Sequence, residues 1–211
     1  MNNNKFSHKN FINVDDIDFD NTHSESEDTD DIKDIKDTEK DTEKDTDDIK
    51  DNTINKKDTF IWEAIHPKWE KKVLSKNFPL VFTFEPSYIH FQYVKSRFKN
   101  DQKVTTLNSA SETGLEQVLN NLNGELNMYL DGHYSGDNTF EGSKVTPIRE
   151  ELKIIEKYLN KFSKLFVAID DFRVFGSQDG HYPTKFSLVE FCEINSLEWK
   201  VEHDIFMFKK N

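Results

Sequence analysis

An alternation of apolar and amphipathic segments, from residue 59 to residue 195, constrains the fold of this chain more than any other feature. Short apolar runs of strand length are followed by longer stretches whose apolar residues recur at helical spacing. The predicted strands are 59–64, 80–85, 103–108, 125–131 and 165–171. The predicted helices are 67–78, 88–98, 114–122, 146–162 (with Thr146 as N-cap) and 183–195. The last segment, 197–210, is predicted to form two strands around a tight turn near His203 and Asp204.

Strands that alternate with helices pair in parallel, and the helices cover both faces of the resulting sheet. The sequence therefore predicts an α/β fold with a Rossmann-like, mostly parallel sheet, and the closing hairpin adds an antiparallel strand at or near one edge. Ligands of such open sheets bind outside the carboxyl ends of the strands, where the strand order reverses. Polar residues that directly follow a predicted strand are thus the candidates for a functional site.

The N-terminal part of the chain differs from this pattern. Residues 15–58 contain 19 Asp and Glu against 7 Lys and Arg, a formal charge of −12, and imperfect "TEKD" and "IKD" repeats. Because this tract has few large apolar side chains to bury, it cannot offset the entropy lost on ordering. We predict a disordered, low-complexity acidic tail over 1–57 and an α/β domain over 58–211.

Composition excludes several classes of function. Residues 59–211 carry a formal charge of only −2, so bulk electrostatics predict no nucleic-acid partner, and the acidic tail would repel anionic membranes. A single cysteine, Cys192, allows no intramolecular disulfide and fits a reducing compartment. No apolar run is long enough for a transmembrane helix or a secretory signal, so we expect an intracellular protein.

Carboxylates follow the fourth and fifth predicted strands. Asp131 ends one of them, and Asp170 with Asp171 ends the apolar run "LFVAIDD". Crowded like charges raise a pKa or require a cation, and Mg²⁺ prefers oxygen ligands. One hypothesis is therefore a divalent-metal site formed by Asp131, Asp170 and Asp171. In the alternative, Asp170 caps the following turn and Asp171 pairs with Arg173.

The glycine-rich segment "DGHYSGDNTFEG" (131–142) follows the fourth strand and is predicted to form a loop over this crevice. His133 within it is a candidate general base or metal neighbour, and Tyr134 is a candidate wall of the substrate site. A histidine that hydrogen-bonds backbone in a tight loop is the alternative. The string Asp-Gly-His-Tyr recurs at 179–182, which makes Asp179 and His181 secondary candidates.

The order of elements and the acids after strands two, four and five resemble class I S-adenosylmethionine-dependent methyltransferases. The paired acids are most similar to the metal-dependent O-methyltransferases of the catechol and macrocin type. The resemblance implies a small hydroxylated acceptor whose hydroxyl is oriented and acidified by Mg²⁺ or a similar divalent ion. It also implies that Glu85 binds the ribose hydroxyls of S-adenosylmethionine and that the loop after the third strand reaches the adenine. That loop supplies Asn108, Ser109, Ser111 and Glu112 as cofactor-binding candidates.

The chain departs from this family after the first strand. A glycine-rich turn is expected there, but the sequence reads Ile65-His66-Pro67 and has no glycine before Gly114. Side chains with a Cβ and a proline hinder close approach of the backbone to the cofactor. Glu63 could still offer a carboxylate to the amino group of the cofactor.

Three functions follow from these observations. The first is methyl transfer to a small hydroxylated acceptor, with Asp131 and His133 as catalytic candidates. The second is a non-catalytic binding or scaffold protein of the same fold, suggested by the missing glycine turn. The third is a metal-dependent glycosyltransferase, because "AIDDF" weakly resembles the acidic motif that holds a metal and a nucleotide sugar.

Overall fold

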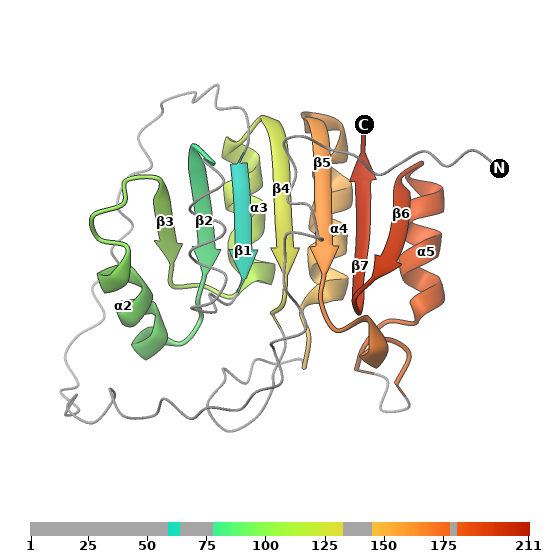
Figure 1. The fold of residues 1–211 in the computed structure, drawn as a ribbon, viewed down its shortest axis with the longest axis horizontal. Coiled ribbons are helices and arrows are strands. Elements are labelled where there is room, and N and C mark those ends of the chain that lie inside the picture. Colours follow the sequence, from blue (N-terminus) through green and yellow to red (C-terminus); the bar gives the residue numbers. More distant parts are fainter. Residues whose placement is uncertain (1–58, 64–77, 133–144, 178–180) are drawn as a thin grey trace. The chain divides into compact units, whose positions relative to one another are not determined.

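The computed structural model describes residues 59–63, 78–132, 145–177 and 181–211. Within them a seven-stranded sheet has the order β3-β2-β1-β4-β5-β7-β6 (Figure 1). All neighbouring strands run parallel except β7, which pairs antiparallel with both β5 and β6. The strands are β1 (Thr59–Glu63), β2 (Leu80–Phe84), β3 (Val104–Leu107), β4 (Gly124–Leu130), β5 (Phe162–Ile169), β6 (Glu198–Glu202) and β7 (Ile205–Lys210).

This arrangement confirms the predicted fold class, a Rossmann-like, mostly parallel α/β sheet with a C-terminal antiparallel hairpin. The described helices are α2 (Tyr88–Arg97), α3 (Ser111–Asn121), α4 (Ile148–Tyr158) and α5 (Lys185–Ile194), with short 3₁₀ turns η3 (Leu159–Lys161) and η4 (Phe172–Val174). The predicted helix 67–78 falls almost entirely outside the described residues, and so does the acidic tail. None of the helices in the described ranges combines the length and the apolarity that crossing a bilayer requires.

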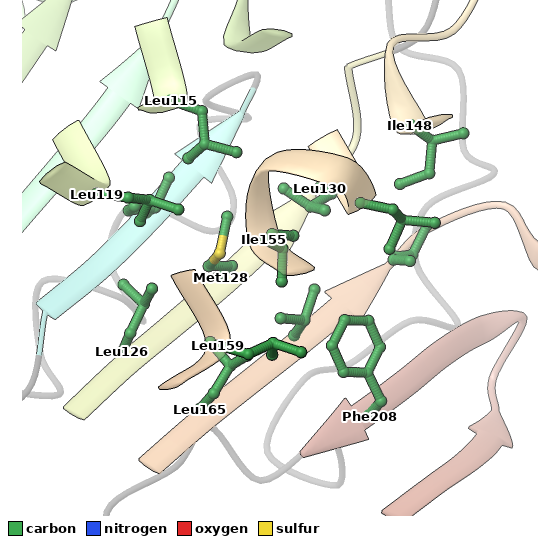
Figure 2. Packing of buried hydrophobic residues seen from close by; sticks show 14 of the residues in the cluster. Leu115, Leu119, Leu126, Met128, Leu130, Ile148, Ile155, Leu159, Leu165 and Phe208 are labelled. Carbon is green, nitrogen blue, oxygen red and sulfur yellow. The ribbon is translucent and has the colours of Figure 1, made fainter. Parts of the chain in front are cut away.

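The main core lies between one face of the sheet and helices α3, α4 and α5 (Figure 1). Strand register aligns Ile61, Met128, Val167 and Phe208 in one row across this face, and each is at most 1% exposed. Leucine and isoleucine side chains of α3 and α4, Ile155 among them, pack onto the row (Figure 2). Each such side chain contributes about 1.5–3 kcal/mol through burial, so this core fixes the strand ends relative to the helices.

The opposite face carries a smaller cluster of Phe60, Phe78 and Val81. The rings of Phe60 and Phe78 stack with their centroids 5.0 Å apart. Among the described helices, α3, α4 and α5 belong to the first face. The prediction that helices cover both faces is therefore confirmed for that face only.

Three predicted boundaries were wrong. Helix α4 ends at Tyr158, because Leu159 to Lys161 form a 3₁₀ turn and Phe162 already begins β5. At its other end Pro147 occupies the N-cap, and the predicted cap Thr146 instead accepts a hydrogen bond from the backbone N–H of Ile148 at 3.4 Å. Helix α3 begins at Ser111, three residues before the predicted start.

Candidate functional site at the carboxyl ends of the strands

The predicted site residues that fall within the described ranges lie at the carboxyl ends of the strands, because the five parallel strands all end on the same side of the sheet (Figure 1). The strand order reverses between β1 and β4: the chain proceeds from β1 to β2 and β3 on one side, and from β4 to β5 on the other. A crevice for a ligand is expected at this switch point. Its two sides are called here the β2–β3 end and the β4–β5 end.

At the β2–β3 end, Glu85 directly follows β2. Its Oε1 accepts a hydrogen bond from the backbone N–H of Ser87 at 3.1 Å. The side chain of Ser87, the N-cap of α2, in turn accepts from the backbone N–H of His90 at 3.5 Å. Burial raises the pKa of Glu85, and the Ser87 hydrogen bond and the nearby His90 partly oppose that rise. Within the described ranges this bond to Oε1 is the hydrogen bond recorded for the Glu85 carboxylate.

Asn108 binds the same loop from the end of β3. Its Nδ2 donates to the carbonyl oxygen of Glu85 at 3.0 Å and to that of Pro86 at 3.3 Å. The residue after β3 thus holds the loop after β2, and Glu85 and Asn108 lie next to each other at this end. Ser109 instead bonds to its own helix start, since its Oγ contacts Thr113 Oγ1 at 2.7 Å and donates to the Ala110 carbonyl at 2.9 Å.

Gly114 allows α3 to lie close against β2. A Cβ at this position would come within 2.6 Å of the Phe84 ring and 3.0 Å of Ser109 Oγ. The first turn of α3, which contains Ser111 and Glu112, is therefore held next to the end of β2. Both residues lie at the expected edge of the sheet, but Ser111 is buried and its hydroxyl donates to Glu151 of α4.

At the β4–β5 end, Asp170 is held from two sides. Its Oδ2 accepts a hydrogen bond from the Tyr129 hydroxyl at 2.6 Å, and its Oδ1 accepts from the backbone N–H of Asp171 at 2.7 Å. Burial raises the pKa of Asp170, whereas these two hydrogen bonds act to lower it. Burial and the negative charges of Asp170 and Asp131 raise the pKa of Tyr129 far above its ordinary range, so Tyr129 stays a hydroxyl donor.

Asp171 has a different partner from Asp170. It has left-handed backbone angles, φ 55° and ψ 42°, and its Oδ1 lies 2.6 Å from Nη1 of Arg173. Arg173 also pairs with Asp204 in the β6–β7 turn and donates its backbone N–H to Asp204 Oδ1 at 2.7 Å. The structure thus agrees with the alternative interpretation for Asp171, which pairs with Arg173. The N-cap of the following turn, however, is Asp171 and not Asp170, and the Asp171 side chain makes no capping hydrogen bond.

The metal hypothesis finds no support in this geometry. No group of three or more His, Cys, Asp or Glu side chains among residues 59–63, 78–132, 145–177 and 181–211 is arranged to hold a metal ion. Asp131 and Asp170 do lie together, but Asp171 is directed to Arg173. The expected ligand set of Asp131, Asp170 and Asp171 is therefore not assembled.

A small pocket opens at the β4–β5 end, beneath the start of α4. Asp131 and Asp170 line it together with Glu151, and Tyr182 and Phe175 form an aromatic wall whose ring centroids are 5.3 Å apart. Leu130, Gly132, Thr146, Ile148 and Ile169 complete the lining. Three carboxyl groups and an aromatic pair thus converge on one small pocket.

Sequence reasoning missed two residues of this pocket region. Glu151 is 1% exposed and lies on the apolar face of α4 between Ile148 and Ile155, where an acid is unusual. That break in the apolar face was a readable signal. Tyr129 lies inside β4, and a tyrosine within a strand gives no such signal.

Other predicted residues stay untested. His133, Tyr134, Asp179 and the turn Ile65-His66-Pro67 lie outside the described residues, and Glu63 ends β1 with a side chain that is not described. His181 is exposed and does not line the pocket.

No family model matches the chain, and no relative is found among curated proteins. Among solved structures, a Streptococcus mutans protein in complex with SAH is similar at 13% identity and TM-score 0.45, over 73% of this chain and 88% of that one. The methyltransferase domain of bacterial CtHen1-C is similar at 13% identity and TM-score 0.46, over 74% and 90%. An rRNA methylase from Streptococcus thermophilus gives 12% identity and TM-score 0.41, over 73% and 86%.

Proposed function

We propose that this protein binds S-adenosylmethionine and transfers its methyl group to a small hydroxylated acceptor. The observation that supports this most is the placement of acids in a methyltransferase-type sheet: Glu85 follows β2 on one side of the switch point, and Asp131 with Asp170 follows β4 and β5 on the other. A cofactor and an acceptor that meet at a switch point need recognition groups on both sides.

The β2–β3 end fits the nucleoside part of the cofactor. Ser87 and Asn108 fix the Glu85 loop, so the Glu85 carboxylate is preorganised to accept from ribose hydroxyls. Asn108 and Glu112 follow β3 on the same side of the switch point, and the proposal assigns them to the adenine. When bound, S-adenosylmethionine supplies a methyl group activated by a sulfonium.

The β4–β5 end suits the acceptor. Asp131 and Asp170 line the pocket, and burial raises the pKa of Asp170, which makes its carboxylate a stronger proton acceptor. Their role is to orient the acceptor hydroxyl and to take its proton. The divalent cation first expected here has no ligand group in the described parts of the chain, so the proposal includes no metal step.

Isothermal titration calorimetry with S-adenosylhomocysteine, the demethylated product, tests the proposal. We expect binding by the wild type and at least a tenfold loss of affinity for Glu85→Ala, about 1.4 kcal/mol or more. Glu116→Ala is the matched control, because Glu116 pairs with Lys157 between α3 and α4 and should leave affinity unchanged. No heat from the folded wild type at millimolar ligand would exclude the cofactor site.

The acceptor half is tested separately. Asp131→Asn should retain S-adenosylhomocysteine binding and lose transfer of labelled methyl groups to a panel of small hydroxylated compounds. Transfer that is undiminished in Asp131→Asn would remove Asp131 from the proposed role.

A second candidate is a non-catalytic binding protein of the same fold. The observation in its favour is the absence of glycine before Gly114, and so the absence of a glycine-rich turn after β1. It predicts no heat with either form of the cofactor, although the protein is folded.

A further inference from the structure

The outer strand β6 leaves one side of the sheet open in the described part of the chain. It is the last strand in the order, and its recorded partner is β7. Every residue of β6 is at least partly exposed, including Trp199 at 38% and Val201 at 40%. Open edges of this kind pair readily with another strand unless the protein blocks them.

The hairpin turn determines which backbone groups of β6 face outward. His203 (φ 50°) and Asp204 (φ 64°) both have positive φ, as a two-residue type I′ turn requires. Glu202 and Ile205, which flank such a turn, form a hydrogen-bonded pair, and the pairs alternate from there along the hairpin. Val201 and Trp199 therefore direct their N–H and C=O groups away from β7.

The side chains of β6 are arranged for pairing with an identical strand. In the sequence Glu198-Trp199-Lys200-Val201-Glu202, charged residues alternate with apolar ones. If Trp199 lies opposite Trp199 of a second copy in an antiparallel pair, Glu198 of each copy faces Lys200 of the other. We propose that the protein forms a two-fold symmetric dimer in which two β6 strands pair in this register and extend the sheet.

In two neighbouring registers the outward N–H and C=O groups of one β6 strand still face those of the other strand. Both registers are less favourable. Centring the pair on Lys200 places Lys200 opposite itself and Glu198 opposite Glu202, so like charges meet. Centring it on Val201 places the turn residues His203 and Asp204 opposite Trp199 and Glu198. Residues with positive φ angles cannot continue a strand. This register therefore has fewer cross-strand pairs between extended residues.

The proposed register also extends charge alternation that already exists within one subunit. Glu198 lies 2.8 Å from Lys209 of β7 and is 54% exposed, and Lys200 pairs with Glu202. In the dimer, Glu198 would lie between Lys209 of its own chain and Lys200 of the other. On the opposite face, Trp199, which stacks on Phe206, would be covered by its symmetry mate.

A charge-swap experiment on the full chain tests the dimer. Sedimentation equilibrium should show the wild type as a dimer. Lys200→Glu or Glu198→Lys should raise the dissociation constant at least tenfold, because each creates two like-charge contacts. Mixing the two variants should restore a heterodimer, since the introduced glutamate of one copy then faces the introduced lysine of the other, and the remaining native pair still has opposite charges. Circular dichroism checks that both variants are folded, because Glu198→Lys also places a lysine beside Lys209.

Crosslinking tests the register. Trp199→Cys should join two chains through a short bifunctional thiol reagent, whereas Lys200→Cys should not, and the native Cys192 is fully buried. A wild type that stays monomeric at all concentrations, or efficient crosslinking by Lys200→Cys alone, would overturn the proposal.

Discussion

The two sides of the switch point satisfy their polar groups differently. At the β2–β3 end, Glu85 and Asn108 bond to backbone groups of the same small set of loops. At the β4–β5 end, side chain bonds to side chain across elements: Tyr129 of β4 holds Asp170 after β5, and Ser111 of α3 holds Glu151 of α4.

The two ends thus meet different structural requirements, one for a single fixed carboxylate and the other for several acids in one pocket. A loop fixed through its backbone keeps the Glu85 carboxylate in place for a ligand. A buried network of side chains brings several acids into one pocket, but each of them must then be satisfied by a partner. We therefore expect changes at the β4–β5 end to lower stability more than changes at the β2–β3 end.

The largest effect is expected from Tyr129→Phe. This variant removes the hydroxyl that donates to the partly buried Asp170 carboxylate, so the free energy of unfolding should fall by about 1–3 kcal/mol. Urea denaturation measures it. Tyr93→Phe is the control: its hydroxyl accepts from Arg97 on an exposed helix face, and its removal should cost less than about 0.5 kcal/mol. Equal losses in both variants would contradict the proposed contrast.

The next effect is a pH dependence of stability that originates at Asp170. Since the folded state raises the pKa of Asp170 above 3.8, the folded protein holds this proton more tightly than the unfolded chain does. The stabilisation that comes from this raised pKa is fully present at pH values below the pKa of Asp170 in the unfolded chain. It is lost as the pH rises from there through the pKa of Asp170 in the folded protein. Each pH unit of that window can remove at most about 1.4 kcal/mol.

Asp170→Asn removes this contribution, so the variant should gain stability relative to the wild type as the pH rises through that window. Denaturant unfolding of both proteins from pH 4 to pH 7 measures the difference. A constant difference across that range would show that Asp170 does not titrate in this way.

A smaller loss is expected from Arg173→Ala. Arg173 links Asp171 to Asp204 of the β6–β7 turn, but its side chain is 60% exposed, so the loss should stay below about 1 kcal/mol. Salt should reduce it further, and thermal unfolding at low and high ionic strength measures both effects. An effect that is large and independent of salt would mean that Arg173 acts through packing instead.

The smallest effect is expected from Asn108→Ala at the β2–β3 end. Water can replace the exposed amide that binds the carbonyl groups of Glu85 and Pro86, so the loss should be about 0.5 kcal/mol. Affinity for S-adenosylhomocysteine should fall even so, because the Glu85 loop is less fixed. If Asn108→Ala kept its affinity for S-adenosylhomocysteine but lost much stability, the β2–β3 end would serve stability and not the ligand, contrary to the proposed contrast.

The sequence predicted the sheet well because its signals are local. Apolar runs mark the strands, and the residues that follow them, from Glu85 to Asp170, do reach one edge. The end of α4 was misplaced because Phe162 continues the helical spacing of apolar residues, although it begins β5. The start of α3 was misplaced because Gly114 resembles a helix boundary, whereas it serves close packing against Phe84.

The chemistry of the β4–β5 end could not be predicted in the same way. The bond between Tyr129 and Asp170 depends on the register of β4 with β5, in which Tyr129 pairs with Ala168. The bond between Ser111 and Glu151 depends on how α3 lies against α4. Both join residues about forty positions apart, and no local pattern encodes them. The left-handed backbone of Asp171 is equally invisible in the sequence.

The strand order also has a kinetic consequence. The central strand β1 pairs through Thr59 with Leu80 and with Leu126, both remote in sequence, whereas Glu202 and Ile205 of the hairpin are close neighbours. Contacts between distant residues form late, because the chain between them must be closed first. The β6–β7 hairpin can therefore form early in folding, whereas the pairing of β1 with β4 at the switch point can form only when chain segments far apart in sequence have been brought together.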